Sequence, residues 1–358
     1  MCFFEIKLEY GETMKKVLFF SRGKGWGHSI RDIEIAKRMR SSNEYDMLFA
    51  SYGAGYKAYS IKGIPCCDLK CSENAYGGQL IKPFISLIRE IKPAWIVSDE
   101  EVLILPIAAS YDIPCCYITN YFVPQDAIES TCIHYSEFII FAEYDDLCPQ
   151  NVPYKIPIHY VGPICQNFHT VKKKATVQNS GDKKIILVLL GGSTQLNVRL
   201  ANMQLVKTII ESNTPNVVYR IVSEEMRYVF ACLSPDNVEW LPRSSGLAKE
   251  VASCDGAIIR GGINTIWEMA FARVPNITVP YPESINPMEI CYAETMEKRG
   301  YTKVIRQAQL SPLSLNKQIE NLLQSPNIFS FPNAPNGTSN DAAAKAAHIL
   351  DQWIVKSK

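Results

Sequence analysis

The sequence predicts an α/β protein that consists of two doubly wound parallel-sheet domains. Short apolar runs alternate with amphipathic helical stretches, an order typical of βα units in a parallel sheet. The alternation stops at a polar segment over residues 164–182 and then starts again. The chain has 358 residues, of which 47% are hydrophobic, and this suits two domains with separate cores. We assign residues 1–163 to the first domain, 164–182 to a linker and 183–338 to the second domain.

In the first half, several apolar runs have the length and composition of strands. They cover residues 17–20, 46–51, 94–98, 115–119 and 138–142. Helical periodicity separates them over residues 29–40, 79–91 and 102–110. The second of these helices has an apolar stripe, which is typical of a core-facing helix and also of a helix that meets lipid. The stripe is formed by Leu80, Ile81, Phe84, Leu87 and Ile88.

The second half repeats this order. Its predicted strands cover residues 184–190, 217–222, 238–241, 256–259 and 276–279. Its predicted helices cover residues 199–212, 246–253, 265–272 and 289–300. A final helix begins near Asn340, a good N-cap residue. The apolar face of this helix is formed by Ala346, Ile349, Leu350 and Trp353.

Charge and cysteine content exclude several classes of protein. The 37 basic and 36 acidic residues give a net charge of +1, whereas proteins that bind nucleic acid usually have a strong cationic excess. No apolar run approaches the roughly 20 residues that a membrane span needs, and Glu5, Glu9 and Glu12 interrupt any signal peptide. The twelve cysteines lack the spacing of a zinc site. We expect a cytoplasmic protein with reduced thiols and no bound metal.

A glycine-rich loop follows the first predicted strand. It reads Gly25-Trp26-Gly27-His28 and leads into a helix, so the backbone could approach a ligand closely. The third glycine of a dinucleotide-binding fingerprint is missing, and the loop alone therefore does not identify the ligand. His28 would lie near the helix N-terminus, where the helix dipole favours a neutral imidazole that can act as a base. A histidine that only caps the helix is the alternative.

A second glycine loop precedes a helix of the second half. It reads Arg260-Gly261-Gly262-Ile263-Asn264-Thr265. Free N–H groups at this helix start, together with the Thr265 hydroxyl, could bind a diphosphate. Glu268 shares the helix face of Thr265, where its carboxylate could accept both hydrogen bonds of a ribose diol. The alternative is an ordinary surface glutamate.

Together with Gly191-Gly192-Ser193 after the first strand of the second half, these motifs resemble those of GT-B glycosyltransferases. The similarity is to the UDP-glycosyltransferase superfamily, which includes the lipid-II-forming N-acetylglucosaminyltransferases of peptidoglycan synthesis. It extends over almost the whole chain, including Val161-Gly162-Pro163 at the domain junction. The resemblance implies two Rossmann-like domains that face each other across a cleft. It also implies that the final helix, residues 339–358, packs back on the first domain.

The resemblance assigns the acceptor to the first domain and the nucleotide-sugar donor, with UDP as the nucleotide, to the second. It implies that Gly262, Ile263, Asn264 and Thr265 contact the diphosphate, that Glu268 binds the ribose and that the backbone near Leu241 binds the base. Gly191, Gly192, Ser193 and Gly261 complete the implied donor site. Glu289 stands where the family has a glutamine that holds the sugar, and an acidic side chain there favours sugar hydroxyls over a carboxylated sugar.

We therefore predict a glycosyltransferase that moves a sugar, with inversion, from a nucleotide diphosphate to an acceptor hydroxyl. His28 would remove the acceptor proton, and Asp99, at the end of a predicted strand, would orient His28. No Asp-x-Asp motif stands near the diphosphate loop, so we expect Arg260 and the helix dipole, without a metal ion, to neutralise the leaving group. No cofactor is expected, and the linker should act as a hinge between the domains.

Two alternatives remain open at this point. The residues from Gly25 to Asp32 are similar to the histidine loop of the nucleotide-sugar hydrolase of pseudaminic acid synthesis, which activates water in place of an acceptor hydroxyl. A degenerate GT-B protein could instead bind a nucleotide sugar without catalysis, although the presence of both His28 and Glu268 argues against this. The acceptor is not identified, and a lipid-linked acceptor would bring the protein to a membrane surface.

Overall fold

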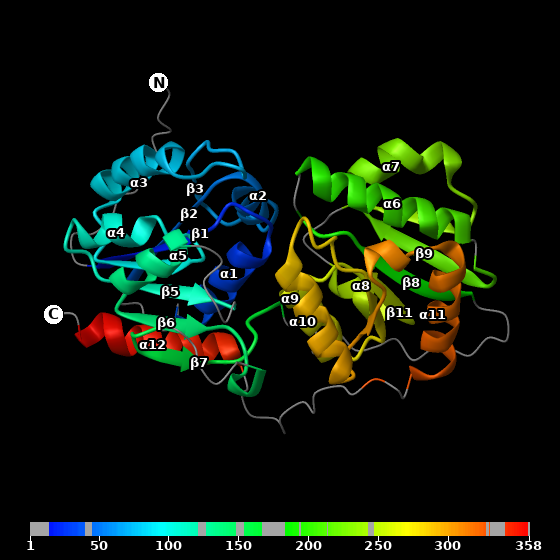
Figure 1. Cartoon of the computed structure of the whole chain (residues 1–358). Coiled ribbons are helices and arrows are strands. Elements are labelled where there is room, and N and C mark those ends of the chain that lie inside the picture. Colours follow the sequence, from blue (N-terminus) through cyan, green and yellow to red (C-terminus); the bar gives the residue numbers. More distant parts are fainter. Residues whose placement is uncertain are drawn as a thin grey trace.

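Two α/β halves lie side by side in the computed structural model (Figure 1). Each half is built on a parallel sheet, with strand order β3-β2-β1-β4-β5-β6-β7 in the first and β10-β9-β8-β11-β12-β13 in the second. Both orders are those of doubly wound sheets, which confirms the predicted fold class. The structure describes residues 14–39, 45–120, 127–147, 154–166, 183–192, 195–212, 214–242, 247–326, 329 and 341–356.

The first half contains every strand and helix that the sequence predicts for it. Its strands are β1 (Lys15–Ser21), β2 (Tyr45–Ser51), β3 (Cys67–Asp68), β4 (Trp95–Asp99), β5 (Cys115–Thr119), β6 (Phe138–Phe141) and β7 (Ile158–Tyr160). Its helices are α1 (Gly27–Met39), α2 (Gly53–Ile61), α3 (Gly78–Ile91), α4 (Ile104–Ala109) and α5 (Ala127–Cys132), with short 3₁₀ helices at Ile133–Tyr135 and Asp145–Leu147. The elements α2, α5, β3 and β7 were not predicted, because the two strands are too short to show a period and α2 is rich in weak helix formers.

The second half follows the same plan. Its strands are β8 (Lys184–Leu189), β9 (Val217–Val222), β10 (Val238–Leu241), β11 (Gly256–Ile259), β12 (Asn276–Thr278) and β13 (Lys303–Val304). Its helices are α6 (Leu196–Ser212), α7 (Glu224–Phe230), α8 (Ala248–Ser253), α9 (Ile263–Phe271), α10 (Pro287–Lys298) and α11 (Pro312–Gln324), with 3₁₀ turns at Ala231–Leu233 and Gln307–Gln309. The prediction missed α7, β13 and α11, although Ser311 and Pro312 form a clear helix start for α11.

Apolar layers cover both faces of each sheet. In β1, Val17 and Phe19 belong to one core, whereas Leu18 and Phe20 belong to the core on the opposite face. A strand that is buried on both faces reads as a continuous apolar run, and this is why the central strands were easy to predict. The apolar stripe of α3 lies in the second of these cores, except for Ile81, which is 41% exposed. The stripe therefore packs the helix on its own domain.

The last helix, α12 (Ala342–Lys356), packs on the first half although it follows the second half in sequence (Figure 1, red). Its buried side chains, among them Leu350 and Ile354, join the core of Val17. The Trp353 ring lies 4.7 Å from that of Phe138. The first half is thus completed by a helix that follows the second half in the chain. None of the helices in the described ranges is long and apolar enough to cross a membrane.

The strand order reverses beside β1 in the first sheet and beside β8 in the second. In doubly wound sheets, ligands bind outside the carboxyl ends of the strands at such a reversal point. The predicted glycine loops leave the carboxyl ends of β1, β8 and β11. The topology therefore brings them to the reversal points of the two sheets.

Candidate active site

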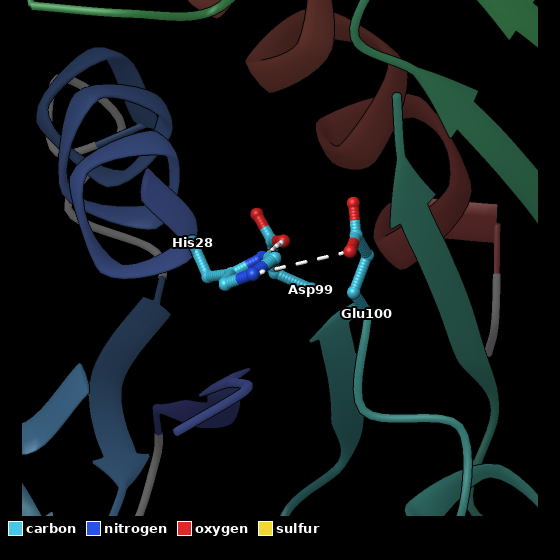
Figure 2. Close-up of side chains that lie close together, drawn as sticks. All are labelled: His28, Asp99 and Glu100. Atoms are coloured by element: carbon cyan, nitrogen blue, oxygen red, sulfur yellow. Dashed lines mark hydrogen bonds and ion pairs between the residues drawn. The ribbon is translucent and has the colours of Figure 1, made fainter. Parts of the chain in front are cut away.

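His28 and Asp99 form a hydrogen-bonded pair at the reversal point of the first sheet (Figure 2). Ser21, at the end of β1, lies beside Asp99 of β4 in the sheet, so the loop after β1 passes the end of β4. The Nδ1 atom of His28 lies 2.8 Å from Oδ1 of Asp99. Nη2 of Arg31 also lies 3.1 Å from Nδ1, but its two hydrogens are directed to Asp99 and Glu100. Because a carboxylate can only accept, we place the proton of a neutral His28 on Nδ1, which leaves Nε2 as the basic nitrogen. The structure thus brings together His28 and Asp99, the pair that the sequence analysis proposed.

Arg31 fixes the orientation of Asp99. It lies one helical turn after His28, is fully buried, and donates from Nε to Oδ2 of Asp99 at 2.8 Å and from Nη2 to Oδ1 at 2.5 Å. Burial alone would raise the pKa of Asp99, but the charge and hydrogen bonds of Arg31 and the contact with His28 outweigh it and hold this pKa below the ordinary value. Asp99 therefore remains a carboxylate and keeps the Nδ1 proton of His28 in place.

Glu100 is a second acidic group at the same site, and the sequence analysis missed it. Its backbone has a φ of +55°, in the left-handed region that favours glycine. Its Oε1 accepts from Nη2 of Arg31 at 3.2 Å, and its Oε2 lies 3.9 Å from Nε2 of His28 and 3.8 Å from Nη1 of Arg22. With its amide oriented to satisfy both groups, Asn120 donates to Oε1 of Glu100 at 3.0 Å and accepts from Arg31. The acidic run that begins at Asp99 was the available sequence signal.

His28, Asp99 and Glu100 also have the side-chain types of metal ligands. In the part of the chain that the structure describes, they form the group whose ligand atoms all lie within 4.8 Å of one another. Both carboxylates, however, already accept hydrogen bonds from the buried guanidinium of Arg31. A cation here would be placed beside that fixed positive charge. The arrangement of donors and acceptors therefore suits proton transfer better than metal binding.

The donor-side loops lie at the reversal point of the second sheet. Gly191 follows β8 with a φ of +76°, and Gly262 is the N-cap of α9 without a side-chain hydrogen bond. Within the described residues, the backbone N–H groups of Ile263, Asn264 and Thr265 have no acceptor. Free amide groups at a helix N-terminus bind anions, because the helix dipole adds to their hydrogen bonds. This part of the second half therefore has the chemistry of a diphosphate site.

The loops of the two halves are in contact. Asn264 donates from Nδ2 to the carbonyl oxygen of Gly27 at 3.2 Å. The indole of Trp26 packs against Gly192 so closely that a Cβ atom at residue 192 would lie 2.6 Å from Cδ1 of the ring. A residue larger than glycine would force the two loops apart. His28, in the first turn of α1, thus follows directly after the residue that contacts the start of α9.

A family model for the glycosyltransferase family 28 C-terminal domain matches residues 186–350. The UDP-N-acetylglucosamine--N-acetylmuramyl-(pentapeptide) pyrophosphoryl-undecaprenol N-acetylglucosamine transferase of Symbiobacterium thermophilum is 24% identical over 191 residues, which are 51% of this chain and 50% of that protein. The chain thus spans about half the length of the curated relatives it matches. The crystal structure of the glycotransferase of kitacinnamycin has a TM-score of 0.66 at 17% identity. The match covers 95% of this chain and 98% of the glycotransferase chain. The chain has the GT-B fold.

The GT-B fold is shared by proteins with other titles. The UDP-GlcNAc 2-epimerase from Neisseria meningitidis, solved with UDP-GlcNAc bound, has a TM-score of 0.63 at 12% identity. The match covers 96% of this chain and 100% of the epimerase chain. At this identity the likeness concerns the fold alone. Side chains at the junction, more than the fold, therefore have to identify the chemistry of this GT-B protein.

Glu268 lies on α9 at the junction of the two GT-B domains. Its Oε1 accepts from the backbone N–H of Gln166 at 3.2 Å, and burial raises its pKa to about 7. Gln166 belongs to the segment that leads to the second half, and the rest of the predicted linker, residues 167–182, lies outside the described residues. Glu268 is therefore a half-buried, hydrogen-bonded group and not an ordinary surface glutamate. Its contact with a ribose remains a prediction.

The structure places the side chain of Arg260 beneath the donor loops. Its guanidinium is buried inside the second domain and stacks on the ring of Tyr281 at 4.7 Å. Its donors bind the side chains of Asn202 and Gln307 and the carbonyl oxygens of Ala201 and Val279. These acceptors take the hydrogen bonds that the guanidinium would otherwise donate to a diphosphate. Arg260 therefore supports the donor loops from below with its hydrogen-bond donors already used, and a contribution of its charge to neutralising the leaving group remains a prediction.

Three further residues were predicted for the donor site: Glu289, Leu241 and Ser193. Glu289, near the start of α10, lies behind Gly261, where a Cβ atom would be 2.9 Å from Cγ of Glu289. Its Oε2 accepts from the N–H of Tyr281 at 3.4 Å, and burial raises its pKa to about 7. Leu241 ends the outer strand β10 and packs against the core that contains Ile263. Ser193 lies outside the described residues.

Proposed function

We propose that this GT-B protein is a glycosyltransferase that moves a sugar from a UDP-sugar to an acceptor hydroxyl. The observation that carries the proposal is the His28–Asp99 pair, which leaves a basic nitrogen beside the free N-terminus of α9. One half thus offers a base for an acceptor and the other an anion site for a donor. The match to the glycosyltransferase family 28 C-terminal domain supports this division of roles.

In the proposed reaction, Nε2 of His28 removes the proton of the acceptor hydroxyl while its oxygen attacks the anomeric carbon of the donor. Asp99 stabilises the imidazolium that forms, as its hydrogen bond to Nδ1 strengthens with the charge. The bond to the diphosphate breaks on the opposite side. Since base and leaving group belong to different halves, we infer a single displacement with inversion at the anomeric carbon.

The leaving diphosphate would be stabilised by backbone groups. The free N–H groups of Ile263, Asn264 and Thr265 supply hydrogen bonds and the positive end of a helix dipole. Gly191 and Gly192 allow the second loop to approach the same phosphates closely. Because these groups carry fixed positive potential, we propose that the transfer does not require a bridging metal ion. Glu268 would bind the ribose.

The name of the Symbiobacterium relative describes an acceptor linked to undecaprenol through a pyrophosphate. A lipid-linked acceptor would bring the present protein to a membrane surface while its donor arrives from solution.

The proposal is tested by measuring UDP release from UDP-N-acetylglucosamine with and without candidate acceptors. We expect release to depend on the acceptor, and His28→Ala to lower turnover by at least ~100-fold, because general-base catalysis contributes on that scale. UDP affinity, measured by calorimetry, should change little, since His28 lies on the other domain from the anion site. Unaltered turnover in the variant would remove His28 from the mechanism. Equal UDP release without any acceptor would instead favour a hydrolase.

A further inference from the structure

One oxygen of Glu100 is held in place without a hydrogen bond. Its Oε1 is occupied by Arg31 at 3.2 Å and, with the amide suitably oriented, by Asn120 at 3.0 Å. Among the described residues, Oε2 has only long contacts, at 3.8 Å to Nη1 of Arg22 and 3.9 Å to Nε2 of His28. Figure 2 shows this second oxygen next to the imidazole ring. The basic nitrogen and a carboxylate oxygen therefore lie side by side.

The position of Glu100 is well determined. Its side chain is 1% exposed, and its backbone N–H donates to the carbonyl oxygen of Ile118 at 3.1 Å. Its φ of +55° is strained for a residue with a side chain, and such strain persists only where the surroundings impose it. Oε2 therefore has no close hydrogen-bond donor among the described residues and can accept one from a bound ligand.

The two atoms make a specific demand on that ligand. With Nδ1 protonated, Nε2 of His28 is an acceptor, and an ionised Oε2 of Glu100 is also an acceptor, so no hydrogen joins them. A single hydroxyl has one proton, which His28 takes during the reaction. To satisfy both atoms at once, the acceptor must present a second O–H or N–H next to the reacting hydroxyl. A vicinal diol and an amino alcohol both have this pair of donors.

We propose that Glu100 is a specificity-determining residue that selects acceptors with a second hydrogen-bond donor on the atom next to the attacked hydroxyl. This inference rests on the proposed glycosyl transfer, because it assigns the substrate class of the same site. In the proposed complex the attacking hydroxyl gives its proton to His28, and the neighbouring hydroxyl or amine donates to Oε2 of Glu100. The neighbouring group keeps its proton throughout the reaction, so it contributes to binding and orientation.

The test compares acceptors in matched pairs. Methyl glycosides that contain a vicinal diol or an amino alcohol are offered with UDP-N-acetylglucosamine beside the derivatives that lack only the second donor. For the wild-type protein we expect kcat/KM to fall by about 10- to 100-fold when that donor is removed, the scale of a hydrogen bond to a charged group. In Glu100→Gln the two members of a pair should differ by less than about threefold, because the discriminating charge is gone.

The matched control is Glu101→Gln. Glu101 is also buried just after β4, but its carboxylate is occupied by the hydroxyl of Tyr52, which donates to it at 2.7 Å. It should keep the wild-type preference for the second donor. If Glu100→Gln lowers kcat/KM equally for both members of each pair, Glu100 only balances the charge of Arg31 and the inference is wrong. The wild-type comparison alone also decides the matter if the variant does not fold, because equal rates with both members would overturn the inference.

Failure of the proposed function gives a different result. If the wild-type protein transfers sugar to no glycoside, binding of the same pairs is measured by calorimetry in the presence of UDP. Tighter binding of the member with two donors, lost in Glu100→Gln, would support the role of Glu100 without the transfer reaction. UDP release that needs no glycoside and is lost in Glu100→Gln would assign both donor hydrogens to one water molecule and overturn the inference of a two-donor acceptor.

Discussion

At the scale of single residues, the direction of one hydrogen bond determines what His28 can do. Asp99 accepts from Nδ1 and is itself held by two hydrogen bonds from Arg31. The imidazole is thus presented with its basic nitrogen toward Glu100 and the junction between the halves. Because of this hydrogen bond, replacing one carboxylate oxygen of Asp99 by an amide nitrogen should change the basicity of His28.

Asp99→Asn tests this tautomer directly. An asparagine amide can donate to Nδ1, which would move the imidazole proton to Nε2 and remove the base. We expect kcat to fall by about 10³- to 10⁴-fold, as when a carboxylate of this kind is replaced in a catalytic triad. UDP affinity should remain near the wild-type value, which controls for damage to the second domain. A variant with kcat near wild type would show that His28 does not depend on Asp99.

At the scale of elements, the contact between two loops sets how closely the halves approach. Trp26 packs on Gly192, and Asn264 reaches Gly27. Both contacts join the start of α1 to the loops that follow β8 and β11. Neither contact belongs to a hydrophobic core, so the loops can be separated without unfolding a domain.

Gly192→Ala should therefore damage catalysis more than stability. The new Cβ atom would lie 2.6 Å from the Trp26 ring and would push the base away from the donor loops. We expect kcat/KM to fall by roughly tenfold or more, since small displacements of reacting groups have effects of this size or larger. The melting temperature should change by less than about 2 °C, because surface changes away from a core are nearly neutral. Recovery of activity in the double variant Gly192→Ala/Trp26→Ala would identify the steric contact as the cause, whereas no recovery would exclude it.

The elements also show what the sequence could predict. Strands such as β1 and β11 were predicted because burial on both faces leaves an unbroken apolar run. His28 and Asp99 were found because each follows or ends such a strand. The roles of Arg31 and Glu100 depend on which strands are neighbours, and this order is not written in any local pattern. For a related reason, the sequence does not show whether the side chain of Arg260 points out of the loop or into the domain.

At the scale of the whole molecule, a buried polar cluster joins the two halves. Glu143 of the first half accepts from Nε1 of Trp267 at 2.9 Å and from the hydroxyl of Tyr292, both in the second half. Nearby, Arg299 donates to Oδ2 of Asp146 at 2.7 Å across the same junction. Because Glu143 is completely buried, its protonation state is coupled to the packing of the two halves against each other.

This cluster gives stability a defined pH dependence. Burial raises the pKa of Glu143 from 4.5 to about 7, so the folded chain retains a proton that the unfolded chain loses above about pH 4.5. The contribution is therefore fully present below pH 4.5 and is lost as the pH rises through 7, and it amounts to roughly 3 kcal/mol. We expect the melting temperature to fall between pH 5 and pH 7.5, and Glu143→Gln, which cannot ionise, to show a smaller fall.

Glu137→Gln is the control for this measurement, because Glu137 is an exposed glutamate of the same half. It should keep the wild-type pH dependence. Glu268 and Glu289, whose pKa values are also raised to about 7, leave a residual fall in the Glu143→Gln protein. An unchanged fall in that variant would show that Glu143 is not the coupled group.

The position of α12 has a consequence for how the protein is made. The first half buries Ala346, Leu350 and Ile354 in the core that also contains β1. A ribosome, however, synthesises α12 only after the whole second half. The first domain therefore leaves the ribosome with part of its apolar core exposed until α12 has been synthesised. Chaperones that shield nascent apolar surface would act during this interval. Separate expression of the first half should succeed only when residues 341–356 are supplied with it.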